Sequence, residues 1–338
     1  MRFIGVDLHT TQMTVCYLKT DSQIKQVKVF QLSRVKDFLS DLRADDFVAV
    51  EATGNSRWFC QQVRQHTEKV TIVDPHSFEV IKRSVKKTDE RDAETLARFL
   101  QAGMLPAARE RTCQQQEVQS LVQTREKLVQ LRTSLINKVH ALLVSHGHKE
   151  KREHLTSAKG LAAVREKHRW SVAEEVELSV IESQIKSLNE GIKQLDQAIE
   201  EAGKKLQGFE NIVTIKGIGA RSAAVLLSVI GRIDDFATEA RLASYFGIVP
   251  RVRNSNQTVH HGRITKQGSR VGRKTLVQCT LIAIRWSPYL KKHYEAIKAR
   301  RGSGKAIIAV ARKLLGIIYK TLRNKWMFED FPNFVLAE

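Results

Sequence analysis

The chain has 338 residues, and its hydrophobic fraction of 42% is too high for a disordered protein. No apolar run approaches the roughly 20 residues needed to cross a bilayer, and the N-terminus lacks the apolar core of a signal peptide, so we expect a cytoplasmic protein without membrane segments. Lys and Arg number 56 against 36 Asp and Glu, and the resulting net charge of +20 favours a partner rich in phosphates.

Residues 1–108 alternate between strand-like and helix-like patterns. Helical patterns separate the later strands but not the first three, which predicts a mixed sheet with helices packed on it. The strand-like runs are residues 2–9, 13–18, 26–32, 47–54 and 69–75, and the helical ones are 35–43, 56–66 and 89–102. The sequence therefore predicts an α/β domain over residues 1–108.

Residues 109–206 are predicted to form a coiled-coil region. A continuous helical pattern covers residues 114–146, and apolar residues from Leu178 to Ile199 recur three and four apart, as in a coiled-coil seam. The first helix is a candidate antiparallel partner for the second within one chain. The two seams are equally compatible with pairing between chains.

Residues 207–338 are predicted to be a basic, mostly α-helical domain with a loop-like insert at 247–272. This segment has 23 Lys and Arg against 8 Asp and Glu, so it holds +15 of the net charge, and residues 240–294 contain no carboxylate. A solvated surface normally mixes charges of both signs, so we favour phosphate binding. The candidate nucleic-acid-binding residues are Gly217, Gly219, Arg251, Arg253, Arg263, Lys266, Arg270, Arg273 and Lys274.

Gly217 and Gly219 have two interpretations. They precede a helical pattern, and a glycine hairpin at a helix N-terminus presents backbone N–H groups to a phosphate, as helix-hairpin-helix modules do. An ordinary tight turn between two helices would use the same residues.

Four carboxylates of the first domain form a candidate metal site. Asp7 and Glu51 each end a predicted strand, and Asp89 and Asp92 lie three apart at a predicted helix start, on one face. Oxygen ligands of this kind suit Mg²⁺ or Mn²⁺, which assist phosphodiester exchange. Each residue alone has a simpler explanation in a turn or in the helix dipole, but the ordered set points to a metal.

These motifs resemble a known family of enzymes. GVDLH, VEATG and KTDERDA match the four DEDD positions of insertion-sequence transposases of the IS110 family and of the related Piv-type DNA invertases, and TIKGIGARSAAVLL, LASYFGIVPR and ITKQG match their C-terminal part. The resemblance covers essentially the whole chain. It implies a RuvC-like (ribonuclease H-like) DEDD domain, a coiled coil and a transposase domain, in that order.

The resemblance also implies a mechanism. In the family, a serine shortly after a Gly-x-x-Pro-Arg segment attacks the DNA phosphate, and the matching residue here is Ser255. The family's covalent phosphoserine conserves bond energy for rejoining, so ATP is not needed. Arg251, Arg253 and Arg263 are expected to hold the phosphate. Thr265 and Ser269 are the alternative nucleophiles.

Partners are implied in the same way. The resemblance implies a bacterial, nucleoid-associated DNA transposase whose homodimers assemble into a tetramer on DNA, with a guide (bridge) RNA that pairs with the DNA. In that assembly Ser255 of one chain faces the carboxylates of another.

Two other classes stay open. A hydrolytic RuvC-type nuclease, such as a junction resolvase, would use the same carboxylates with water as the nucleophile and would not need Ser255. A non-catalytic nucleic-acid-binding scaffold would need the basic third and the coiled coil but none of the four carboxylates.

Overall fold

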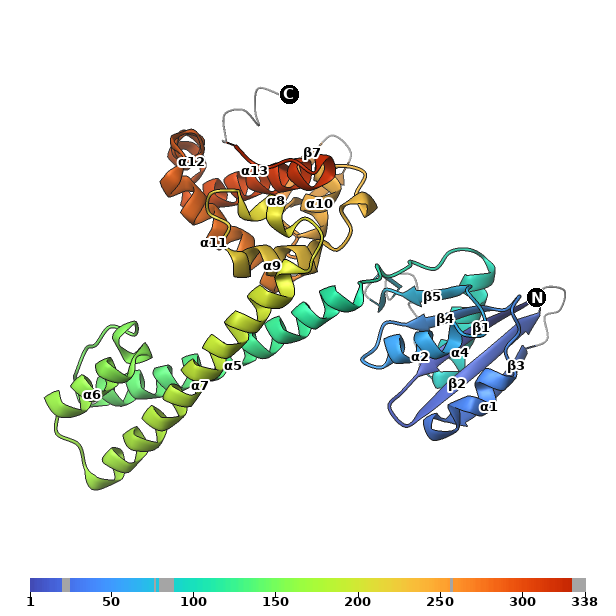
Figure 1. Ribbon diagram of the computed structural model, residues 1–338, viewed down its shortest axis with the longest axis horizontal. Coiled ribbons are helices and arrows are strands. Elements are labelled where there is room, and N and C mark those ends of the chain that lie inside the picture. Colours follow the sequence, from blue (N-terminus) through green and yellow to red (C-terminus); the bar gives the residue numbers. More distant parts are fainter. Residues whose placement is uncertain (20–24, 76, 79–87, 256–257, 330–338) are drawn as a thin grey trace. The chain divides into compact units, whose positions relative to one another are not determined.

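A computed structural model of the chain describes residues 1–19, 25–75, 77–78, 88–255 and 258–329 (Figure 1). The chain divides into two compact units, Met1–Glu110 and Arg111–Glu338, each with its own hydrophobic core. Among the described residues, no helix has the length and apolar character to span a bilayer.

The first unit is built on a five-stranded mixed sheet. Its strands are β1 (Arg2–Leu8), β2 (Gln12–Lys19), β3 (Lys25–Gln31), β4 (Phe47–Glu51) and β5 (Val70–Val73). They lie in the order β3-β2-β1-β4-β5, with β1, β2 and β3 antiparallel and β4 and β5 parallel to β1. The five predicted strands and the mixed sheet are confirmed.

Helices cover both faces of this sheet. Alternate residues of β1 point to opposite sides, so Ile4 and Val6 pack with α1 (Val35–Ser40) and α2 (Ser56–Val63). On the other side Phe3 packs with α4 (Asp89–Gln101). Gly5 permits the close approach of α4, because a Cβ atom there would lie 2.1 Å from the backbone oxygen of Ala93. This contact holds the interior of α4 against the middle of β1.

The second unit begins with a long helical hairpin, α5 (Cys113–Ser145) and α7 (Val172–Lys204). Ion pairs Lys138–Glu177 and His146–Glu174 join the two helices, and their residue numbers show that the helices run antiparallel. Between them lie η2 (His154–Thr156) and α6 (Ala158–Lys167). The predicted antiparallel pairing within one chain is thus present, whereas regular coiled-coil packing stays a prediction.

Five of the seven residues in the predicted seam of α7 are buried, and Leu188 and Leu195 are half-buried. Leu178, Ile181, Ile185, Ile192 and Ile199 are all less than 9% exposed. Their spacing of three, four and seven residues keeps them on one face of the helix, so burial follows the heptad pattern.

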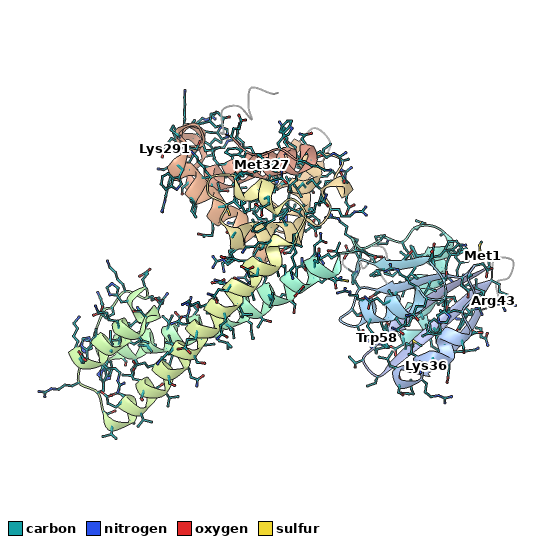
Figure 2. All side chains as sticks on the ribbon, in the orientation of Figure 1. Met1, Lys36, Arg43, Trp58, Lys291 and Met327 are labelled. Atoms are coloured by element: carbon teal, nitrogen blue, oxygen red, sulfur yellow. The ribbon has the colours of Figure 1, made fainter. Side chains whose placement is uncertain are left out.

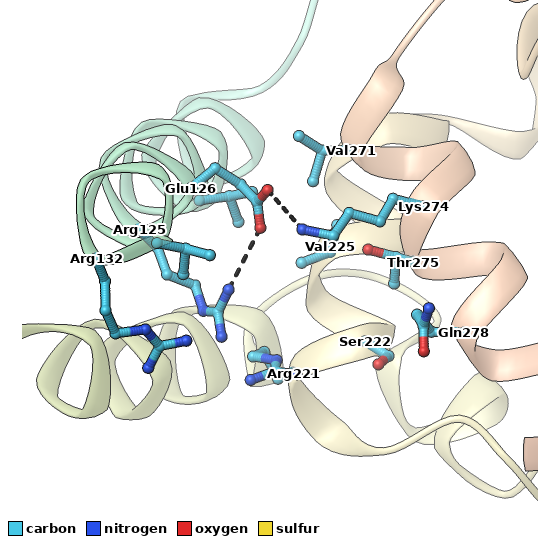
Figure 3. A pocket seen from close by; sticks show the side chains of 12 residues that line it. Arg125, Glu126, Arg132, Arg221, Ser222, Val225, Val271, Lys274, Thr275 and Gln278 are labelled. Atoms are coloured by element: carbon cyan, nitrogen blue, oxygen red, sulfur yellow. Dashed lines mark hydrogen bonds and ion pairs between the residues drawn. The ribbon is translucent and has the colours of Figure 1, made fainter. Parts of the chain in front are cut away.

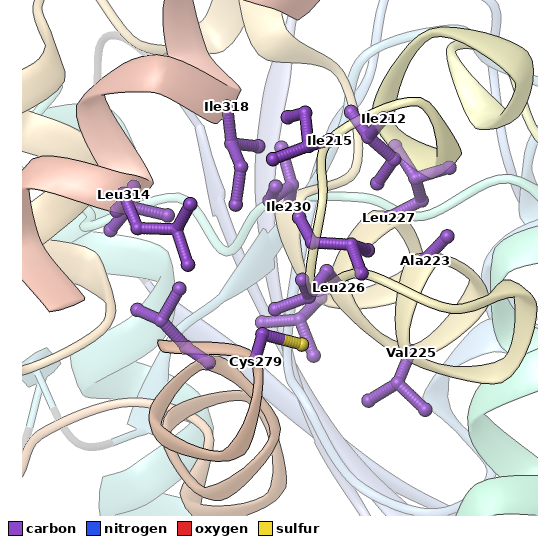
Figure 4. Close-up of a cluster of buried hydrophobic side chains, with 14 of the residues drawn as sticks. Ile212, Ile215, Ala223, Val225, Leu226, Leu227, Ile230, Cys279, Leu314 and Ile318 are labelled. Carbon is purple, nitrogen blue, oxygen red and sulfur yellow. The ribbon is translucent and has the colours of Figure 1, made fainter. Parts of the chain in front are cut away.

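The remaining helices of the second unit surround a second core. They are α8 (Phe209–Val213), α9 (Ala220–Ile230), α10 (Glu239–Tyr245), α11 (Arg270–Trp286), α12 (Pro288–Arg301) and α13 (Ser303–Asn324), with η3 at Ile233–Asp235. Every residue of α9 from Ala223 to Ile230 is buried, among them Leu226, which lies near Cys279 and Leu314 (Figure 4). Val118 of α5 and Ile199 of α7 belong to the same core, so the base of the hairpin is packed into the C-terminal helices. The predicted boundary at 206 stays a prediction.

The predicted loop-like insert at 247–272 contains regular structure and has to be corrected. Strands β6 (Pro250–Ser255) and β7 (Thr258–Ile264) form a two-stranded antiparallel hairpin. Val252, Val259 and Ile264 supply strand-forming residues, and the polar residues between the strands favour a turn. The many charges of this segment hid that pattern.

Candidate active site

The candidate acidic site of the first unit lies at the ends of β1 and β4 and at the start of α4. In the parallel register Val6 lies beside Val50, so Asp7 and Glu51 follow at neighbouring positions of the two strands. Both residues lie on the face covered by α4, because Phe3 and Ala49 of the same strands pack against this helix. The sheet therefore brings two predicted carboxylates to one edge, as the sequence pattern indicated.

The first turn of α4 carries the other two carboxylates. Of the four predicted ligands, Asp7 and Asp89 lie close enough to share an ion, whereas Glu51 and Asp92 lie outside that group. The Thr88 side chain accepts a hydrogen bond from the backbone N–H of Arg91 and caps the helix, which starts at Asp89. Asp89 is half exposed, whereas Asp92 is only 9% exposed. The negative charges of both residues act on Asp7.

His9 is a member of this cluster that sequence reasoning missed. Its Nε2 lies 3.2 Å from Oδ2 of Asp7 and 3.7 Å from Oδ2 of Asp89. One potential ligand atom from each of these three residues lies within 4.8 Å of the others. The available signal was the two-residue spacing from Asp7 just beyond a strand, which places both side chains on one side.

A second missed residue, Asn55, holds the loop that carries His9. Its side-chain Nδ2 donates to the backbone oxygen of His9 at 2.9 Å. Asn55 directly precedes α2, so this bond ties the segment after β4 to the segment after β1. It helps to fix His9 beside the carboxylates.

Electrostatics make the cluster attractive to a cation. Burial raises the pKa of Asp7, His9 opposes this shift, and the charges of Asp89 and Asp92 add to it. An ionised Asp7 is therefore costly in the protein alone. The two carboxylates are ligands that Mg²⁺ and Mn²⁺ prefer, whereas the imidazole is a better ligand for softer transition metals, so the donor set as a whole fits a divalent cation.

Ser255 is the last residue of β6 and pairs with Thr258 across the hairpin. The side chains of Ser255 and Arg253 lie outside the described part of the chain. Arg251, earlier on β6, is exposed, and its Nη2 donates to the backbone oxygen of Thr265 at 3.4 Å. The position of the Ser255 backbone is thus set by strand pairing at the end of β6.

The two alternative nucleophiles have other surroundings. The Ser269 side chain accepts a hydrogen bond from the backbone N–H of Gly272 at 3.1 Å and caps α11. The hydroxyl of Thr265 is buried and has no hydrogen-bond partner in the described structure.

The predicted nucleic-acid contacts differ in their availability. Arg263, Lys266 and Arg270 are exposed, and further basic side chains such as Lys291 of α12 point outward from the helices (Figure 2). Arg273 instead donates from Nη1 to the backbone oxygens of Phe246, Gln267 and Gly268, and burial lowers its pKa. These hydrogen bonds explain the position of the Arg273 side chain without a contact to nucleic acid.

The two glycines before α9 also differ. Gly217 has a φ of +105°, and a Cβ atom there would lie 2.9 Å from backbone atoms of Ala283 and Cys279. Packing against α11 therefore requires this glycine without any phosphate. Gly219 has open space around it and forms the uncapped start of α9, where backbone N–H groups lack a side-chain partner.

Two models of protein families match this chain. A model of DEDD transposases of IS110 type matches residues 4–147, and a model described as "Transposase IS116/IS110/IS902 family" matches residues 210–295. The first match spans Asp7, Glu51, Asp89 and Asp92, and the second spans Ser255.

Several curated proteins are similar over most of their length. The transposase for insertion sequence element IS1111A of Coxiella burnetii is 24% identical, with 96% of this chain and 90% of that protein covered. A probable family 20 transposase of Pseudomonas aeruginosa is 23% identical, with 95% and 97% covered. A pilin gene-inverting protein of Moraxella lacunata is 26% identical, with 83% and 81% covered.

Proposed function

We propose that this chain, a DNA transposase of the IS110/IS116 family, cuts and rejoins DNA strands of an insertion sequence through the hydroxyl of Ser255. The observation that carries the metal-dependent part of the proposal is the convergence of Asp7, His9 and Asp89 at the carboxyl end of the central strand β1. Ser255 is proposed from its place after the Gly-x-x-Pro-Arg segment. The strand order of this sheet is consistent with a ribonuclease H-like fold, whose edge holds the acidic residues.

Asp7, Glu51, Asp89 and Asp92 would hold Mg²⁺ or Mn²⁺, with His9 beside them. When bound, the cation would supply positive charge to the phosphate oxygens. The fold brings these carboxylates to one end of the sheet. The register of β1 and β4 places Asp7 and Glu51 at neighbouring positions, and the capped first turn of α4 carries Asp89 and Asp92, whose charges act on Asp7.

Ser255 is proposed to attack the phosphorus of the scissile bond. Its Oγ forms a new O–P bond, the P–O bond to the leaving strand breaks, and the hydroxyl proton passes to a base while the leaving oxygen takes up a proton. The phosphoserine keeps the bond energy, so the reverse attack by a strand end rejoins DNA without ATP. Arg251, Arg253 and Arg263 would balance the charge of the phosphate.

The assembly belongs to the proposal as well. We infer a homodimer that joins into a tetramer on DNA, with a guide RNA that pairs with the DNA, and Ser255 of one chain acting with the carboxylates of another. The excess of basic residues in the last third, +15 of +20, supports binding of a large polyanion.

Strand cleavage with single variants tests this function. Wild-type protein with matched DNA, Mg²⁺ and RNA transcribed beside the gene should cut DNA, whereas Ser255→Ala and Asp92→Asn should not. The alternative function is a hydrolytic nuclease, favoured by the observation that the acidic cluster lies within the first unit alone. Cutting by Ser255→Ala but not by Asp92→Asn would establish that alternative.

A further inference from the structure

A cavity of about 260 Å³ lies among α5, α9 and α11 of the second unit (Figure 3). Four basic side chains line it: Arg125, Arg132, Arg221 and Lys274. Arg221 and Lys274 belong to the basic segment 207–338, and only Lys274 is among the nucleic-acid-binding residues that the sequence predicts. The hydroxyls of Ser222 and Thr275 also line the cavity and add neutral hydrogen-bonding groups.

Two carboxylates hold these cations in place without neutralising all of them. Glu126 lies 3.3 Å from Nη1 of Arg125 and 2.9 Å from Nζ of Lys274. Asp196 of α7 contacts Arg125 and lies 3.0 Å from Nη1 of Arg221. Four cations against two carboxylates leave the cavity positive, and the carboxylates keep the long side chains ordered before a ligand arrives.

The charge balance is visible at Asp196. Burial tends to raise its pKa, yet the hydrogen bond from Arg125 and the charge of Arg221 bring the pKa below its ordinary value. The positive groups therefore outweigh the loss of solvation at this carboxylate.

Arg132 adds a positive charge to the lining of the cavity. Its Nη1 donates to Oδ1 of Asn189 at 2.7 Å. Because Asn189 carries no charge, this hydrogen bond orients the guanidinium group without neutralising it.

The chemistry of the lining points to a phosphate. Guanidinium groups present planar pairs of donors that match phosphate oxygens, and the cavity holds three of them from two helices together with an ammonium group. We propose that this cavity binds a backbone phosphate of a nucleic acid and forms an anchoring site made by the helical hairpin and α9. The proposal rests on the proposed function only in taking nucleic acid as the partner.

Glu126 and Asp196 hold the cationic side chains in place, and in this proposal they also compete with the phosphate for those cations. If these ion pairs only held the helical hairpin against α9 and α11, replacing either a cation or a carboxylate would lower the stability of the fold. Neither replacement would raise the affinity for nucleic acid. If the cavity binds phosphate, loss of a carboxylate would strengthen binding. The sign of the effect at Glu126 therefore separates the two roles.

The experiment measures equilibrium binding of the full chain to duplex DNA, single-stranded DNA and an RNA hairpin over a series of salt concentrations in EDTA. Arg221→Gln is compared with Arg323→Gln, since both arginines are 44% exposed and paired with an aspartate. Glu126→Gln is compared with Glu177→Gln, whose carboxylate is paired with Lys138 on the same hairpin. Each pair has the same change in net charge.

Arg221→Gln should weaken binding about tenfold and reduce the slope of log K against log salt by about one, the value for one lost phosphate contact. Glu126→Gln should strengthen binding by a similar factor, a gain that misfolding cannot produce. The two control variants should change affinity less than about twofold, as expected for charges outside the contact. If the variants change binding of only one of the three nucleic acids, the cavity binds a phosphate of that nucleic acid. If they change binding of all three equally, the cavity accepts a phosphate of any nucleic-acid backbone.

Equal losses for Arg221→Gln and Arg323→Gln, or weaker binding by Glu126→Gln, would overturn the proposal. Because EDTA prevents metal-dependent cutting, neither result depends on Ser255. Failure of the serine mechanism would leave these binding differences unchanged, so the two claims fail separately.

Discussion

Asp7 is the residue on which the acidic site depends most. Its carboxyl is only 19% exposed and lies among His9, Asp89 and Asp92. Burial and the two like charges make the ionised form unfavourable in the folded protein, and a bound cation would reverse this. A site that is costly in isolation and favourable with a cation is what a functional metal centre requires.

Replacing Asp7 by Asn should therefore stabilise the chain in EDTA. A carboxyl whose pKa is raised in the folded state contributes most stability below its ordinary value of 3.8 and loses that contribution as the pH rises through the folded pKa. At pH 7 Asp7→Asn should melt a few degrees above wild type, and the difference should shrink towards pH 3.8. Thermal unfolding at several pH values measures this.

The control for this change is Asp37→Asn, which removes an exposed aspartate paired with Arg34 on α1. It should not raise the melting temperature. Added Mg²⁺ should stabilise wild type and not Asp7→Asn. A variant that melts at or below wild type in EDTA would contradict the proposed strain at Asp7.

At the scale of elements, α7 owes its start to a capping box. The Ser171 side chain accepts a hydrogen bond from the backbone N–H of Glu174, and the Glu174 carboxylate accepts one from the N–H of Ser171. That backbone N–H, together with His146 of α5 and the Ser171 hydroxyl, lowers the pKa of Glu174 to about 2. The cap thus links the helix start to its partner helix.

Ser171→Ala should lower the free energy of unfolding of the second unit by about 1 kcal/mol. The backbone N–H of Ser171 and the His146 side chain, which lower the pKa of Glu174 most, remain in this variant, so both proteins should lose most of the same stability as the pH falls from 4.5 to about 2. Denaturant unfolding at pH 7 and pH 3 measures it. Ser187→Ala, an exposed site within α7, is the control and should change stability by less than about 0.5 kcal/mol. Equal effects of both variants would exclude a role for the cap.

Strands and long helices were predictable because their patterns are strong. Alternating apolar residues such as Ile4, Val6 and Leu8 indicated the sheet, and the heptads of α7 indicated its buried face. The β6–β7 hairpin was missed because its strands carry charges where a strand beside a core would carry apolar residues. His9 was missed because a single histidine after a strand forms no sequence pattern. Its partner Asp89 lies on α4, far along the chain, and comes close only in the folded structure.

At the scale of the whole molecule, contacts between distant segments decided what the sequence left open. The carboxylates at positions 7, 51, 89 and 92 were predictable as a set because strand ends and helix starts carry local signals. The cation pocket was not, because Arg125 and Lys274 are 149 positions apart and meet only through the packing of α5, α9 and α11. For the same reason the sequence did not predict that the base of the α5–α7 hairpin shares a core with the C-terminal helices.

The proposed assembly predicts complementation between two inactive variants. Ser255→Ala keeps the carboxylates, and Asp7→Asn keeps the serine. If an active site combines residues of two chains, coexpressed variants form hybrid sites with all groups present, and cutting should return, although each variant alone is inactive. DNA cleavage by the coexpressed pair measures this. Continued inactivity of the pair, beside active coexpressed wild type, would place the whole site within one chain.

The most direct test of the serine mechanism is to trap the covalent intermediate. Wild-type protein, matched DNA, RNA from beside the gene and Mg²⁺ are mixed and quenched in denaturant, and the protein is digested and analysed by mass spectrometry. We predict a nucleotide joined to the peptide that contains Ser255, and its absence in Asp7→Asn, Asp92→Asn and EDTA. Cut DNA without any protein adduct, or an adduct on Thr265 or Ser269, would contradict the assignment of Ser255 as the nucleophile.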